Sequence, residues 1–208
     1  ASLGAKVLQT RSVELAMNHR VPVRVLSSFE GPVPSPNTGT LVCDEEQIVE
    51  KQVVSGVAYS RDEAKFSMIG VEDHPGVAAT IFGALADAGV NVDMIVQASA
   101  KTEGRQNMVF TCPDRDAAHA KAVLEKLNGS VGYESLSVDR DVAKVSVIGV
   151  GMRSHAGVAK TMFQALSSKG INIQVISTSE IKISVLIDAS YTELAVRALH
   201  TAYGLDAD

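Results

Sequence analysis

Hydrophobic and polar positions form one pattern that occurs twice along the chain. Residues 65–97 read KFSMIGVEDHPGVAATIFGALADAGVNVDMIVQ, and residues 144–178 read KVSVIGVGMRSHAGVAKTMFQALSSKGINIQVIST. With Gly76 aligned on Gly157, ten of the twenty positions from that glycine onward are identical. In each copy an alternating apolar segment precedes a segment with helical spacing, and a second apolar segment follows. The pattern therefore predicts strand, helix and strand in both copies of an internal repeat.

Each predicted helix has local signals for its start, its end and its buried face. We expect Pro75 to lie in the first turn of the first helix, and Asp73 or Ser154 to cap the free amides at the helix starts. Gly89 and Gly170 follow the two helices, where a left-handed C-cap residue is expected. The predicted buried stripes are Val77, Ile81 and Leu85 in the first copy and Val158, Met162 and Leu166 in the second.

The segments after each repeat predict further elements of a sheet. In the first copy we expect a third strand over 107–112, a helix over 114–127 and a fourth strand over 131–138. This order, β-α-β-β-α-β, is that of a ferredoxin-like domain. The second copy has a third strand over 182–187 and a helix over 191–203, with no fourth strand after them.

The apolar segment Val53–Tyr59 predicts a strand that the first copy does not need. We expect it to complete the sheet of the second copy, so that the first copy is inserted within the second. The predicted fold class is α+β, with two ferredoxin-like domains. Their expected extents are residues 64–139 for the first domain and residues 53–60 plus 143–208 for the second.

The beginning of the chain predicts a separate, incomplete piece. Residues 5–18 have the spacing of a helix, and Val21–Leu26 is a short β-branched run. Residues 30–40 hold three prolines and two glycines in eleven positions, which predicts no regular element. Because one helix and one strand cannot enclose a core, we expect residues 1–43 to be the end of a larger domain, with a boundary near 44–52.

Composition narrows the class of protein. The 208 residues are 46% hydrophobic and 21% charged, which excludes a disordered chain. The net charge of −5 predicts no nucleic-acid partner. The sequence has no run of 18 apolar residues, so we expect no membrane span. Two distant cysteines without a CxxC motif, and five dispersed histidines, predict a reduced cytoplasmic protein without a metal site. The glycines at 149 and 151 lack the third glycine of a dinucleotide fingerprint.

The repeat resembles a known family. The segments IGVEDHPG and IGVGMRSHAG, followed by NVDMIVQ and NIQVISTSEIKISV, closely resemble the tandem ACT domains of aspartate kinases. The opening GAKVLQTRSVELA and VPVRVLSSF resemble the last helix and strand of the amino-acid-kinase domain in that family. The resemblance covers nearly the whole chain, but the body of the kinase domain is missing.

This resemblance implies an allosteric role. ACT domains bind free amino acids, so we expect threonine, lysine or both to bind at ACT–ACT interfaces and control aspartate phosphorylation by a catalytic kinase subunit or domain. The resemblance also implies a homodimer through the ACT domains. It implies no catalytic residue and no cofactor in this chain, which alone should be inactive; ATP and Mg belong to the intact kinase. Both a natural small subunit and a fragment agree with the sequence, and the alternative function is an ACT regulator not attached to a kinase.

The first loop, DHPGVA, has groups that match those of a free amino acid. Amides at a helix start suit a carboxylate, and Gly76 allows close approach. Asp73 and Asp93 could bind an ammonium, and Gln97 a hydroxyl. On residue chemistry alone, Asp73 could equally be a cap and Asp93 a solvated side chain; the resemblance favours a binding role for Asp73, Gly76, Ala78 and Gln97.

The second copy has an equivalent but longer loop. Asn172 suits a turn as well as a ligand contact, whereas Glu is depleted in strands, which makes Ser179 and Glu180 candidates for contacts. The expected effector-binding residues are Asp73, Gly76, Val77, Ala78, Asn91, Asp93 and Gln97 in the first copy, and Ser154, His155, Gly157, Val158, Ala159, Asn172, Ile173, Thr178, Ser179 and Glu180 in the second.

Overall fold

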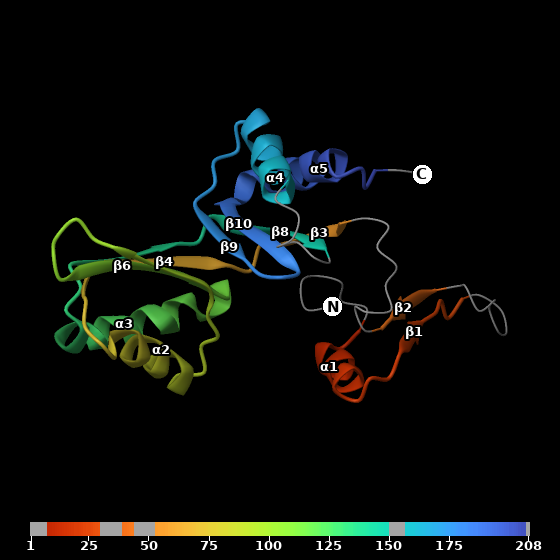
Figure 1. Ribbon diagram of the computed structural model, residues 1–208. Helices are drawn as coiled ribbons and strands as arrows, with labels where there is room; N and C mark the ends of the chain where they lie inside the picture. Colours follow the sequence, from red (N-terminus) through yellow and green to blue (C-terminus); the bar gives the residue numbers. More distant parts are fainter. Residues whose placement is uncertain (1–7, 30–38, 44–52, 150–156, 207–208) are drawn as a thin grey trace. The chain divides into compact units, whose positions relative to one another are not determined.

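The computed structural model describes residues 8–29, 39–43, 53–149 and 157–206 (Figure 1). It divides into two compact units, the amino-terminal unit Ala1–Val53 and the main unit Val54–Asp208. The expected boundary near 44–52 lies outside the described residues.

The amino-terminal unit has one helix and a two-stranded antiparallel sheet. Helix α1 (Thr10–Asn18) is followed by β1 (Val23–Val25), which pairs with β2 (Thr40–Val42). The expectation of no regular element through residue 40 is wrong at Thr40, which pairs with Val25. None of its described residues is buried, so this unit has no core of its own within the described part.

The first copy of the repeat is a four-stranded antiparallel sheet with two helices. The strand order β5-β6-β4-β7 is the ferredoxin-like order. Phe66 and Phe110 stack at 5.1 Å between ring centroids, and Phe82 of the first helix packs edge-on against Phe110. The elements are β4 (Ala64–Glu72), α2 (Val77–Asp87), β5 (Asp93–Ser99), β6 (Arg105–Cys112), a 3-10 turn (Asp114–Asp116), α3 (Ala117–Val131) and β7 (Ser135–Asp139).

The second copy takes its fourth strand from the segment before the first copy. Strand β3 pairs antiparallel with β8, with Tyr59 opposite Val145. This confirms the prediction that the strand belongs to the sheet of the second copy. The strand order is β3-β8-β10-β9. The elements are β3 (Val54–Ser60), β8 (Val142–Gly149), α4 (Gly157–Ser168), β9 (Val175–Thr178), β10 (Lys182–Asp188), a 3-10 turn (Ala189–Tyr191) and α5 (Thr192–Ala202).

The start of α2 differs from the expected one. The helix begins at Val77, after Pro75, and its N-cap is Gly76 with a left-handed φ of +97°. No side chain caps it, so the expected capping role of Asp73 is wrong; the Asp73 amide instead donates to the Gly104 carbonyl at 2.9 Å. The chain turns into the helix through a glycine conformation rather than through a capping side chain.

The ends of α2 and α4 confirm the glycine prediction and explain where the next strands begin. Gly89 and Gly170 have φ of +72° and +69°. The amides of Val90 and Ile171 then donate back to the carbonyls of the last helical turn. Because these residues close the helix ends, β5 and β9 begin three and four residues later than the strands that the repeat predicts over 90–97 and 171–177. Strand β7 also begins later, since α3 continues to Val131.

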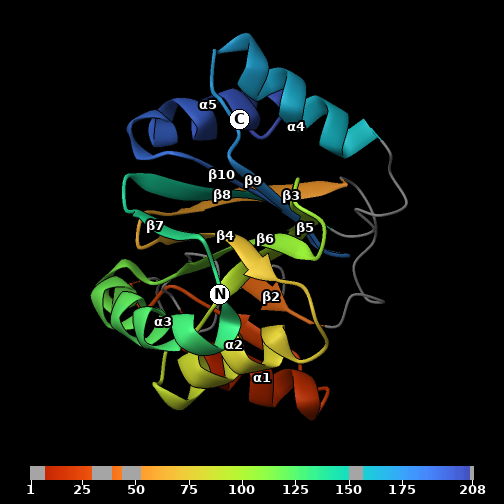
Figure 2. The same cartoon turned by 90° about the vertical axis from the view of Figure 1, so that its left-hand side faces the viewer.

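The two sheets of the main unit face each other. Figure 2 shows four layers, with α4 and α5 outside one sheet and α2 and α3 outside the other. The residues of both predicted apolar stripes, on α2 and on α4, are buried as expected. A small apolar cluster lies between the sheets and contains residues of both copies; it consists of Met94, Val142, Val175 and Leu186, with Val96 and Val109 packed against it.

Candidate functional site

The loop between β4 and α2 presents the start of a helix to solvent. Gly76 has no atom within 4 Å of the position that a Cβ would occupy, so a ligand can approach its backbone. The Val77 amide donates to the His74 carbonyl at 3.3 Å, a long hydrogen bond. The first turn of a helix otherwise lacks intrahelical acceptors and carries partial positive charge. Asp73 is exposed beside these amides. The loop therefore offers groups for both a carboxylate and an ammonium.

Gln97 lies at the same end of the sheet as this loop. Its side-chain amide donates to the side-chain carbonyl of Gln106, which is buried. Gln106 also donates to the Glu72 carbonyl at 3.4 Å, immediately before the loop. Sequence reasoning missed Gln106, although a buried polar side chain among Met108, Phe110 and Cys112 breaks the apolar pattern of β6. The structure thus brings Asp73, Gly76, Ala78 and Gln97 to one end of the sheet.

Asp93 lies at the opposite end. It is level with Thr111 of β6, whereas Glu72, just before the loop, is level with Arg105. These two β6 residues are six positions apart, which corresponds to about 20 Å along a strand. Asp73 and Asp93 of one chain therefore do not contact the same ammonium, and of these two candidate acids only Asp73 belongs to the loop at the start of α2. Asn91 precedes Asp93 and lies at this far end as well.

The Asp93 carboxylate already has partners. One oxygen accepts from the Met94 amide at 2.8 Å, and the other contacts Lys144 Nζ at 2.9 Å. Partial burial by itself raises the pKa of Asp93, but the hydrogen bonds from Lys144 and Met94 outweigh it and lower the pKa below its usual range. Asp93 is therefore an ionised partner of a lysine from the other sheet.

The equivalent loop of the second copy is only partly described. Ser154 and His155 lie outside the described residues. Gly157, Val158 and Ala159 form the first turn of α4, and the Tyr203 hydroxyl donates to the Val158 carbonyl at 2.7 Å. Burial raises the pKa of Tyr203 to about 12, so the phenol stays a neutral donor. This hydrogen bond from the C-terminal end of α5 holds the first turn of α4 in place.

Strand β9 separates the remaining candidates of the second copy into two groups. Asn172 and Ile173 precede the strand, and Thr178 ends it. Ser179 then donates from its amide to the Lys182 carbonyl at 2.8 Å in the turn to β10, and exposed Glu180 follows. As in the first copy, the residues before and after the edge strand lie at opposite ends of the sheet.

The described part of the chain holds neither a cluster of metal ligands nor a membrane-spanning helix. No three histidine, cysteine, aspartate or glutamate side chains there are placed to hold a metal ion. None of the helices in the described ranges is long and apolar enough to cross a membrane.

Comparison with protein families and known relatives identifies the repeat. Models of the ACT domain match residues 68–130 and residues 145–203. An aspartokinase of Pseudomonas aeruginosa is 52% identical over 210 residues, which cover 100% of this chain and 49% of that protein. An aspartokinase of Helicobacter pylori is 47% identical, with 50% of its length covered. The chain thus spans about half the length of the curated relatives it matches.

Solved structures of aspartokinases also match, and here the match covers nearly the whole of the related chain. A crystal structure of aspartokinase alpha and beta subunits contains a chain that is 48% identical, with a TM-score of 0.68; the match covers 73% of this chain and 99% of that one. The ligand-free regulatory subunit of aspartate kinase from Thermus thermophilus is 44% identical, with the same coverage and a TM-score of 0.69.

A more distant structure spans nearly the whole chain. Aspartokinase III of E. coli, in complex with lysine and aspartate, is 25% identical with a TM-score of 0.70, and the match covers 98% of this chain and 43% of that protein. The assignment rests on two ACT domains in a chain whose match covers 99% of a regulatory subunit of aspartate kinase. The chain belongs to the aspartokinase family and carries the regulatory region with two ACT domains.

Proposed function

We propose that this chain senses threonine, lysine or both, and that binding changes the rate at which an attached or associated catalytic part phosphorylates aspartate. The observation that carries the proposal is the open helix start at Gly76, with exposed Asp73 in the same loop. Gln97 of the edge strand β5 lies at the same end of the sheet and is linked through Gln106 to the Glu72 carbonyl, just before the loop. An amino acid brings a carboxylate, an ammonium and a side chain to such a place. The lysine complex of the E. coli relative supports an amino-acid ligand.

Threonine matches the groups of the first copy well. The amides of Val77 and Ala78 suit its carboxylate, Asp73 suits its ammonium, and Gln97 suits its hydroxyl. Gln97 is held by Gln106, so its amide is oriented before the ligand arrives. Pre-organised groups lose less entropy on binding, which favours affinity.

The residues at the far ends of the edge strands find a place in a dimer. Strands β5 and β9 are edges of their sheets, and on them Ile95 is 50% and Ile176 44% exposed. If β5 of one protomer pairs antiparallel with β9 of a second protomer, the end of one strand meets the beginning of the other. Asn172 and Ile173 of the partner subunit then lie beside Gln97. This homodimer would complete each effector site from two chains.

Calorimetric titration with a panel of amino acids tests the function. We expect threonine to bind the folded chain and Asp73→Ala to weaken binding about tenfold or more, because a hydrogen bond to a charged group contributes roughly 1.5–3 kcal/mol. Gln97→Ala removes a neutral hydrogen bond and should weaken threonine binding less, by roughly 0.5–1.5 kcal/mol. Exposed Asp87 and Gln164 offer matched controls, and their alanine variants should bind threonine like the wild type.

Two outcomes would contradict parts of this proposal. Failure of both threonine and lysine to bind the folded wild type rejects the sensor. Normal threonine binding by Gln97→Ala rejects only the role of that residue. An ACT regulator unconnected to a kinase would bind the amino acid without changing aspartate phosphorylation, so inhibition measured together with the catalytic part separates the two functions. Binding and inhibition should weaken together in the variants, since the coupling is reciprocal.

A further inference from the structure

Two rows of residues face each other between the sheets of the main unit. In the first copy, Lys65 and Asp93 are both level with Thr111, one on each side of it. In the second copy, Lys144 is level with Leu186, and the Gln174 amide donates to the Leu186 carbonyl at 2.8 Å. The central residues Thr111 and Leu186 are fully buried. Each row thus runs from the beginning of a central strand to the beginning of the edge strand.

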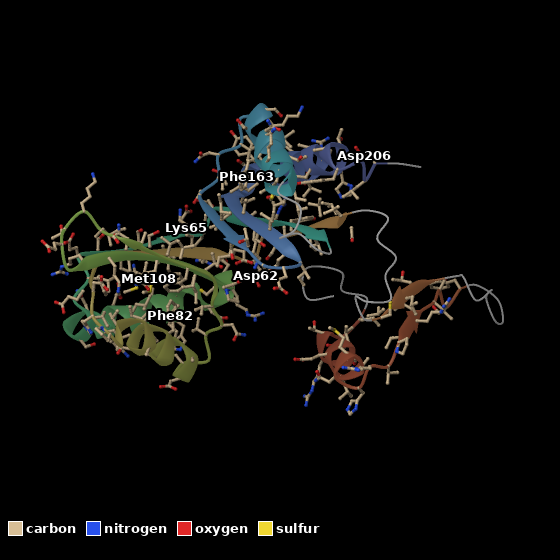
Figure 3. The ribbon with its side chains drawn as sticks, in the orientation of Figure 1. Asp62, Lys65, Phe82, Met108, Phe163 and Asp206 are labelled. Carbon is tan, nitrogen blue, oxygen red and sulfur yellow. The ribbon has the colours of Figure 1, made fainter. Side chains whose placement is uncertain are left out.

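The internal repeat relates the two rows to each other. Lys65 opens KFSMIGV and Lys144 opens KVSVIGV, while Asp93 and Gln174 are the third residues of NVD and NIQ. The two copies therefore place a lysine and a polar partner at equivalent positions. Figure 3 shows Lys65 on the side of β4 that faces the other sheet, whereas Met108 and Phe82 lie on the helix side.

The contacts between these rows are crossed. Lys144 of the second copy reaches Asp93 of the first copy at 2.9 Å, and Lys65 of the first copy donates to the side-chain carbonyl of Gln174 in the second. The lysine side chains are only 12% and 19% exposed. We call these two contacts the crossed lysine pair. Lys144 thus binds the first residue of β5, and Lys65 binds the residue immediately before β9.

Neighbouring carboxylates keep both lysines in place. Lys144 also contacts Glu63 at 2.6 Å, and Lys65 contacts Asp139 at 3.3 Å. Burial by itself lowers the pKa of Lys144, but hydrogen bonds to Glu63 and Asp93 outweigh it and raise the pKa above its ordinary value. The lysine is therefore charged where it crosses between the sheets.

The backbone at the start of β5 needs such support. Met94 has a φ of +49°, a left-handed conformation that is unusual for a residue other than glycine, and its side chain is buried between the sheets. The register of β5 against β6 shifts between Asp93 and Val96. Asp93 accepts from the Met94 amide with one oxygen and binds Lys144 with the other. Strained backbone persists only where its surroundings determine it.

We propose that Lys65 and Lys144 are positioning residues, each of which fixes the beginning of the edge strand in the opposite ACT domain. Lys144 fixes Asn91–Met94 of the first copy, and Lys65 fixes Asn172–Val175 of the second. The consequence for effector binding rests on the proposed function. In the proposed dimer the start of each edge strand lies beside an effector site, and each start is held by a lysine of the opposite domain, so the two sites are coupled through the crossed lysine pair.

Amide hydrogen exchange of the ligand-free full chain, followed by mass spectrometry, tests the crossed relation directly. Lys144→Gln should speed exchange of residues 91–96 roughly tenfold, the effect of losing one charge-assisted hydrogen bond. Lys65→Gln should speed exchange of residues 172–177, and more weakly, because Gln174 is neutral. Lys121→Gln, which removes a helix-surface pair with Glu125, is the matched control and should change neither segment. Unchanged exchange at 91–96 in folded Lys144→Gln would overturn the proposal.

A second variant protects the test against misfolding. If Lys144→Gln does not fold because Glu63 is left unpaired, Asp93→Asn removes only the cross-domain charge and should still speed exchange at 91–96. Gln174→Glu creates an ion pair with Lys65 and should slow exchange at 172–177. Failure of both shifts rejects the positioning role.

Titration of the same variants with threonine and lysine separates this proposal from the sensor function. We expect Lys144→Gln to weaken effector binding by roughly fivefold or more, within the usual range of coupling between sites. If neither amino acid binds the wild type, the sensor function fails, while the exchange experiment still decides the role of the lysines. Unchanged effector affinity together with faster exchange rejects the coupling and leaves the positioning role.

Discussion

The hydroxyl of Thr111 is buried on the strand between Lys65 and Asp93. Thr111 is fully buried, and its Oγ1 has no hydrogen-bond partner among the described residues. Its neighbours in the sheet are Lys65 and Asp93, whose side chains bind elsewhere. An unpaired buried polar group costs stability, and Thr111 occupies the position that Leu186 occupies in the second copy.

Thr111→Val should therefore increase stability. The substitution keeps the branched shape and removes the unpaired hydroxyl, so we expect a gain of about 1 kcal/mol in the free energy of unfolding. Urea unfolding at constant m-value measures this gain. Thr192→Val is the control, because that hydroxyl is paired with the Ala189 carbonyl at 2.6 Å and its loss should destabilise. A loss of stability in Thr111→Val would mean that the hydroxyl is bonded in solution.

At the scale of elements, β3 decides whether the second sheet is complete. It covers one side of β8 through six paired positions, from Val54 opposite Gly149 to Ser60 opposite Lys144. All four strands of the first copy lie after residue 63, so they do not depend on β3. Its loss should therefore affect the two copies unequally.

Two truncated chains test this dependence. A chain of residues 53–208 retains β3 and should unfold cooperatively, with protected amides in β8 and β10. A chain of residues 62–208 should lose that protection while β4 and β6 of the first copy stay protected. Heteronuclear NMR with hydrogen exchange distinguishes the two. Protected amides in β8 of the shorter chain would show that three strands suffice.

At the scale of the whole molecule, the exposed isoleucines of the edge strands predict self-association. We expect sedimentation to give a dimer at micromolar concentration, and Ile95→Lys to shift it to monomer because a charge then lies in the paired edge. Tyr191→Lys changes an apolar side chain that is also exposed but is not on an edge strand, and should leave the dimer intact. A wild-type monomer, with or without threonine, would contradict the dimer.

Local signals in the sequence determined most of the architecture. Three features followed from the repeat: the apolar stripes of the two helices, the glycines at the ends of α2 and α4, and the sheet to which strand Val54–Ser60 belongs. These features depend on residues a few positions apart, or on counting strands, so a single sequence contains them. The start of α2 was mispredicted because Asp73 and Gly76 both signal a helix start, and only the backbone conformation decides between them.

Tertiary structure alone decided which polar residues meet. Asp93 and Lys144 are 51 residues apart in the chain, and neither has a local pattern that indicates the other. Their contact depends on strand register within each sheet and on the packing of the two sheets face to face. Strand register in the first sheet also places Asp93 and Asp73 at opposite ends, and it places Gln97 beside buried Gln106. The periodicity that determines helices and strands is a local property of the sequence. The partners of charged side chains depend on packing between residues that are distant in the sequence.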